Sequence, residues 1–70
     1  MDVEMLAKAI LKAVEARARL LIYLYNCGDD VDCIKEACVD AAHDVASAFK
    51  LSSSTAEKIA RRVMLEFTDS

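Results

Sequence analysis

The chain has 70 residues and a net charge of -3; 56% of its residues are hydrophobic, and it contains one glycine and no proline. A chain of this length forms one domain, and its composition excludes a disordered protein, a sheet protein with many turns and a protein that coats nucleic acid through bulk positive charge. The longest apolar run, Leu20 to Tyr25, is far shorter than the roughly 20 residues of a membrane helix, and the first residues lack the basic stretch of a secretory signal. We therefore expect residues 1–70 to form a single all-α domain, a small three-helix bundle, in the cytoplasm and with no membrane contact.

The first helix is predicted over about residues 2–26. Apolar residues recur at alternating spacings of three and four from Val3 to Cys27, which is the period of an α-helix. A second apolar seam runs beside the first, so the helix is either central to a bundle or covered on a second side by another subunit. We therefore expect a homodimer through this helix. The expected interface residues are Ile10, Ala13, Arg17, Leu20 and Leu24.

Arg17 is the one charged residue in this apolar seam. A guanidinium in the middle of an apolar face needs a partner or a route to water. Its aliphatic stem could run past Ala13 and Ala16 to bring the charge to solvent, or the charge could pair with an acidic group of another helix or subunit. The sequence leaves both alternatives open.

The second helix is predicted over about residues 30–49. Gly28 can take the left-handed conformation that ends the first helix, and the aspartates at 29 and 30 can cap the next one. One face of this helix is apolar and the opposite face is acidic. An acidic stripe is ordinarily a solvated surface, and it could also dock a basic protein partner. The stripe consists of Asp32, Glu36, Asp40 and Asp44.

The third helix is predicted over about residues 55–67. Ser54 and Glu57 have the spacing of a capping box, in which each side chain accepts a hydrogen bond from the backbone N–H of the other residue. The predicted inner face of this helix is apolar, and its predicted outer face carries Lys58, Arg61 and Arg62.

Residues 42–61 resemble the helix-turn-helix unit of bacterial repressors, especially of the lactose-repressor type. The resemblance rests on Asp44-Val45-Ala46, on Phe49 and Leu51 beside the turn, and on Ser52 and Thr55 at the start of the next helix. Lys50 occupies the turn position where the family usually has glycine. The resemblance implies a DNA-binding transcriptional regulator that acts as a homodimer and presents its second helix to the major groove of duplex DNA. The implied DNA contacts are Lys50, Ser53, Ser54, Lys58, Arg61 and Arg62.

The alternative is an ordinary helix hairpin in a small acidic protein that binds another protein, such as a phage- or plasmid-encoded inhibitor of nucleic-acid machinery. In that case the acidic stripe is the docking face and the partner is a basic protein. Charge reversal along the stripe should then abolish protein binding and matter little for DNA binding. Removal of cations from the third helix should weaken DNA binding and be tolerated in protein binding.

The three cysteines and the one histidine do not form a predicted metal site. Cys33, Cys38 and His43 are five residues apart on one helix, so each is rotated by about 140° from the last and the three cannot meet at one ion. Asp40 and His43 have a spacing that is also used in di-iron bundles, but both lie on the polar face. A disulfide between Cys27 and Cys33 is geometrically possible, although three cysteines without a secretory signal favour reduced thiols. We expect no metal, no cofactor and no enzymatic activity.

Overall fold

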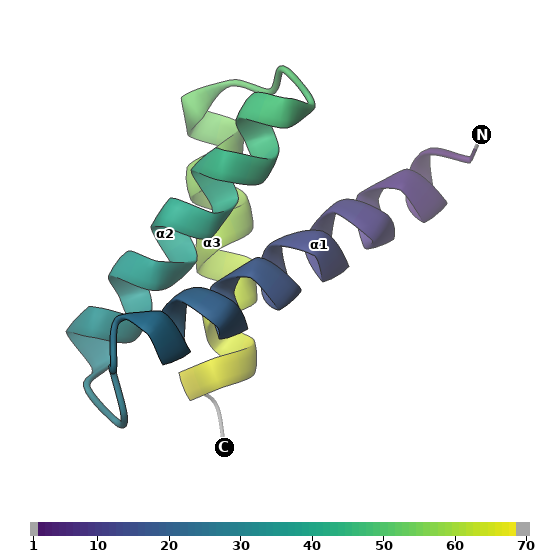
Figure 1. Cartoon of the computed structure of the whole chain (residues 1–70). Coiled ribbons are helices and arrows are strands. Elements are labelled where there is room, and N and C mark those ends of the chain that lie inside the picture. Colours follow the sequence, from purple (N-terminus) through teal and green to yellow (C-terminus); the bar gives the residue numbers. More distant parts are fainter. Residues whose placement is uncertain (1, 69–70) are drawn as a thin grey trace.

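The computed structural model describes residues 2–68 of the chain. They form α1 (Val3–Leu24), α2 (Val31–Ala48) and α3 (Ser53–Thr68), and no strand occurs among these residues (Figure 1). The predicted all-α three-helix architecture is confirmed. Every helix boundary lies within two residues of its predicted position.

The first helix ends in a Schellman motif that is centred on Asn26 rather than on the glycine. Asn26 has a φ of 56°, its N–H donates to the Tyr23 carbonyl at 3.1 Å, and the Cys27 N–H donates to the Ile22 carbonyl at 3.1 Å. Asparagine tolerates this left-handed conformation better than most residues with a side chain. Gly28 follows with a φ of 57°, as predicted, and the two left-handed residues together reverse the chain.

A disulfide joins Cys27 to Cys33 across this reversal. Asp30 caps α2 by accepting from the N–H groups of Asp32 at 3.0 Å and Cys33 at 3.2 Å, which brings the first turn of α2 next to the end of α1. The two cysteine Cα atoms are 5.3 Å apart, within the usual range for a disulfide. The prediction that reduced thiols are favoured is therefore wrong for this pair, because the chain reversal brings Cys27 in the turn next to Cys33 in the first turn of α2.

The turn between α2 and α3 is a second Schellman motif. Lys50 has a φ of 59°, its N–H donates to the Ser47 carbonyl at 3.2 Å, and the Leu51 N–H donates to the Ala46 carbonyl at 2.8 Å. Lys50 thus adopts the left-handed conformation for which glycine is better suited, at a cost of about 1 kcal/mol.

The third helix begins two residues earlier than predicted, because Ser52 caps it. The Ser52 hydroxyl accepts from the Thr55 N–H at 3.2 Å and lies 2.9 Å from the Thr55 hydroxyl, and the Ser52 carbonyl accepts from the Ala56 N–H at 3.0 Å. The predicted capping box of Ser54 and Glu57 is wrong, since Ser54 already lies inside the helix.

Helices α2 and α3 run antiparallel side by side (Figure 1). Lys35 and Met64 line the same pocket although both are far from the α2–α3 turn in sequence. The two helices therefore stay together well beyond the turn. The α2–α3 pair has the arrangement of a helix hairpin.

The first helix lies across one side of this hairpin, and only part of its length is covered. Val14, Ala18 and Leu21 are buried in the core, whereas residues 2–9 are all exposed, and the N-terminal half of α1 projects beyond α2 and α3 (Figure 1). The core is built largely from small side chains, which allow the helices to approach closely. The remaining buried residues are Cys27, Ile34, Ala37, Cys38, Ala41, Ala42, Ala46, Ala56, Ala60 and Val63.

Candidate interaction surfaces

The predicted DNA-contact residues are all exposed, and we call the set that they form the basic edge. Lys50 is in the turn between α2 and α3, and the other members are on α3. Within residues 2–68, no salt bridge involves Lys58, Arg61 or Arg62. The members of the basic edge are Lys50, Ser53, Ser54, Lys58, Arg61 and Arg62, and all six are exposed.

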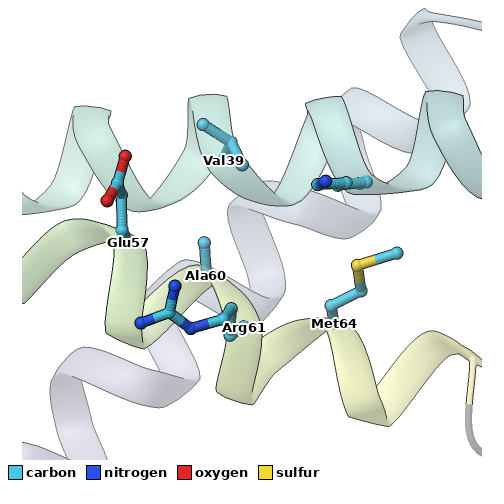
Figure 2. A pocket seen from close by; sticks show the side chains of 6 residues that line it. Val39, Glu57, Ala60, Arg61 and Met64 are labelled. Carbon is cyan, nitrogen blue, oxygen red and sulfur yellow. The ribbon is translucent and has the colours of Figure 1, made fainter.

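A shallow pocket of about 240 Å³ lies where the basic edge meets α2. Figure 2 shows Val39 on α2 facing Ala60 and Met64 on α3, with Glu57 and Arg61 at the rim. The pocket is lined by a cation from each helix, Lys35 and Arg61, and also by the Glu57 carboxylate. This mixture of charges does not favour an anion over a cation.

Half of the predicted acidic stripe is engaged by α1. The Tyr25 hydroxyl donates to the Asp40 carboxylate at 2.8 Å, and the Arg17 Nε lies 3.5 Å from an oxygen of Asp44. The hydrogen bond to Asp40, followed by desolvation and the charges of the stripe, raises the pKa of the Tyr25 hydroxyl above its usual value. Two members of the stripe therefore help to hold α1 against α2, and Asp32 and Glu36 remain as its exposed part without such contacts to α1.

The contact with Asp44 shows which of the two alternatives for Arg17 the structure adopts. The guanidinium pairs with an acidic residue of another helix in the same chain, and both side chains stay about half exposed. On the other flank of α1, Arg19 donates to Glu15 at 2.8 Å, and its guanidinium carbon lies 5.2 Å from the centre of the Phe67 ring. The charged residues on the two flanks of α1 therefore bind it to both other helices, in part through a cation–π contact.

An apolar groove lies between the projecting half of α1 and the start of α3. Its volume is about 380 Å³. The groove is lined by apolar side chains except for Thr55, whose hydroxyl already interacts with Ser52. Val3 and Leu6, at its open end, are 79% and 39% exposed. The lining residues are Val3, Leu6, Ala7, Ile10, Leu11, Leu51, Thr55 and Ile59.

The five residues of the predicted dimer interface follow one seam of α1 but have different surroundings in the structure. Ile10 is half-buried and lines the apolar groove, and Arg17 is paired with Asp44. Ala13, Leu20 and Leu24 are exposed. The sequence shows a wide apolar arc on α1, but it does not show which part of this arc α2 and α3 cover. The groove residues on α3 were therefore not predicted.

Within residues 2–68, no group of three or more potential ligands lies close enough to hold a metal ion. Cys38 is buried, and desolvation raises the pKa of its thiol. His43 is exposed. The helices formed by residues 2–68 also lack the length and apolar character needed to cross a bilayer.

Comparisons with protein-family models, with curated proteins and with solved structures found no match to this chain.

Proposed function

We propose that this protein is a protein-interaction module that binds an amphipathic helix of a partner protein in the apolar groove between α1 and α3. The observation that carries the proposal is the projection of the N-terminal half of α1, which leaves the core-facing side chains of its first turns without cover (Figure 1). Apolar burial is worth about 25 cal/mol per Å², so a partner that covers these side chains gains free energy. The proposal keeps the protein-binding alternative of the sequence analysis, but its docking surface is the apolar groove instead of the acidic stripe.

The lining of the groove defines the chemistry of its partner. Both walls are helices, whose backbone N–H and C=O groups bond within the helix except in the terminal turns. An extended peptide would find no edge of unpaired backbone to pair with, whereas a helix satisfies its own backbone and needs only an apolar face. The one polar lining residue, Thr55, is already engaged by Ser52. The partner is therefore a helix with apolar residues at spacings of three and four.

A titration with a designed peptide tests this proposal. The peptide is a helix with leucine on one face and charged residues on the other, and its control has the same composition in scrambled order. In two-dimensional NMR spectra, we expect the amphipathic peptide to shift the amide signals of Leu6, Ile10 and Ile59, and the scrambled peptide to leave them in place. Leu6→Glu should abolish the shifts and Lys8→Glu, on the polar side of α1, should not. Equal shifts with both peptides, or shifts confined to α2, would contradict the proposal.

A second candidate function is DNA binding through the basic edge. One observation favours it: Lys50 adopts the left-handed turn conformation that the repressor resemblance requires at the position where the family usually has glycine. The side-by-side packing of α2 and α3 and the acidic stripe on α2 weigh against it, because they keep α3 close to a negatively charged surface.

A mobility-shift assay at about 50 mM salt tests this second candidate, since even non-specific binders retain affinity under such conditions. Binding through the basic edge predicts weaker complexes for Arg62→Ala and Lys58→Ala, and no loss for charge reversal at Asp32 or Glu36. The absence of a shift with any duplex at high protein concentration would exclude DNA binding.

A further inference from the structure

One side of α1 faces neither α2 nor α3, and we call it the outer face. Its side chains are apolar and lie at spacings of four, four, three, four and four residues, so the spacing is the same in either direction along the helix. Met5, Leu20 and Leu24 are 65%, 46% and 62% exposed. The outer face consists of Met5, Ala9, Ala13, Ala16, Leu20 and Leu24, and it shares no residue with the apolar groove.

We propose that the outer face binds the outer face of a second copy of this chain, with the two α1 helices antiparallel. A two-fold dimer makes every contact twice, so its surface must be complementary to itself. The symmetric spacing provides this complementarity. Met5 meets the partner's Leu24, Ala9 meets the partner's Leu20, and Ala13 meets the partner's Ala16.

The sizes of the side chains fit the geometry of two crossing helices. Straight helices that cross are closest at the crossing point and diverge away from it, and their separation depends on the side chains at the contact. In the antiparallel pairing, two alanines meet at the centre, an alanine meets a leucine one turn away, and a methionine meets a leucine at each end. Side-chain volume therefore increases in step with the distance between the helices.

A hollow at the end of the outer face provides space for the end of the partner helix. Its lining residues are Arg19, Ile22, Tyr23, Leu24, Asn26 and Gly28, so it borders the outer face at Leu24 and extends toward the Arg19 flank of α1. In the antiparallel pairing, Met5 of the partner subunit arrives beside Leu24, at the edge of this hollow. Arg17 stays outside the interface with Asp44, so the dimer buries no charge of the outer face.

The oligomeric state of charged variants tests the proposal. By light scattering at high micromolar concentration, we expect the unmodified protein to have twice the 7.7 kDa mass of one chain. Ala16→Glu places a carboxylate at the closest approach of the two helices and should give a monomer. Ala48→Glu, the same substitution at an exposed position of α2, should remain dimeric. A monomeric unmodified protein, or a dimer that survives Ala16→Glu, would overturn the proposal.

A mixing experiment tests the register and guards against simple misfolding. Ala13→Lys should also be monomeric on its own, because two lysines then lie near the two-fold axis. An equimolar mixture of the Ala13→Lys and Ala16→Glu variants should form a heterodimer, since each lysine then faces a glutamate. Failure of the mixture to associate, with both variants helical by circular dichroism, would exclude this register.

Cross-linking distinguishes antiparallel from parallel pairing. With a short bismaleimide, Ala13→Cys should form covalent dimers, because the two introduced thiols lie near the symmetry axis. Leu24→Cys should not, because the two thiols are roughly 28 Å apart along the helices at 1.5 Å per residue. Cross-linking of both variants would indicate a parallel pair and would overturn the proposed arrangement. The proposal does not depend on the groove, so a negative peptide titration leaves it unaffected.

Discussion

The Tyr25 hydroxyl donates to the Asp40 carboxylate at 2.8 Å, and this bond joins the C-terminal cap of α1 to the middle of α2. Asp40 is half-buried, while Asp44 one turn later contacts Arg17, so two successive acidic side chains hold α1 in place. The acidic face of α2 is thus partly an internal contact surface.

This bond predicts a dependence of stability on alkaline pH. The pKa of Tyr25 is raised in the folded protein above its ordinary value of 10.0, mainly by its hydrogen bond to Asp40. The neutral phenol is therefore favoured by folding, so its contribution to stability is complete below about pH 10 and is lost as the pH rises through the folded-state pKa. Thermal unfolding between pH 8 and pH 11 should show this loss in the unmodified protein. Tyr25→Phe should be slightly less stable at pH 8 and should lose less stability as the pH rises; identical pH profiles would contradict the role of this bond.

Lys50→Gly should stabilise the protein by about 1 kcal/mol. Glycine adopts a positive φ without the steric cost that a lysine pays, and no hydrogen bond of the Lys50 side chain is lost within residues 2–68. Asn26→Gly is the matched comparison at the other left-handed turn, and its gain should be smaller because asparagine already tolerates this conformation. Urea unfolding measures both changes, and a destabilised Lys50→Gly variant would show that the lysine side chain contributes to the fold.

Reduction of the disulfide between Cys27 and Cys33 should lower stability by about 2 kcal/mol, the value expected for a cross-link that closes a short loop. The intact mass before and after reduction should differ by two hydrogens, and the melting temperature should fall when a reductant is added. A Cys27→Ser, Cys33→Ser double variant should melt at the lower temperature with and without reductant. A melting temperature that is insensitive to reductant in the unmodified protein would contradict the cross-link.

Cys38→Ser should destabilise the protein by about 1–3 kcal/mol, because it places a hydroxyl in an apolar site. Cys38 is 1% exposed and lies among the alanines of α2 and α3. Cys38→Ala creates a small cavity but buries no polar group, so it should cost less than serine. Chemical unfolding under oxidising conditions separates this effect from the disulfide, and equal stabilities of the serine variant and the unmodified protein would contradict the burial of Cys38.

The helices could be predicted from the sequence because their apolar periods and capping residues are local signals. The start of α3 has no single local signal, since four consecutive hydroxyl residues can each serve as a cap. Ser52 takes this role because the Leu51 N–H bonds back to Ala46, which sets the chain direction just before Ser52. The capping box predicted from Ser54 and Glu57 did not take into account the turn formed by the bond from Leu51 to Ala46.

The contacts between helices could not be predicted in the same way. The seam from Val3 to Leu24 is continuous in sequence, but α2 and α3 cover only part of it, and the place where they stop depends on how α1 crosses the hairpin. The same is true of Arg17, whose partner Asp44 is 27 positions later in the chain. The disulfide depends on two left-handed residues, of which only Gly28 was identified from the sequence.

The projection of α1 has a consequence for local folding. Residues 2–9 are all exposed and none belongs to the buried core, so these turns are held mainly by their own hydrogen bonds and by the Asp2 cap. Such turns open with a free energy smaller than that of global unfolding, and their amide hydrogens exchange faster than those near Val14 and Leu21. A helix that docks in the groove shifts this equilibrium toward the folded turn, so binding is thermodynamically linked to helix formation. The first two turns of α1 would therefore report occupancy of the groove through slower hydrogen exchange.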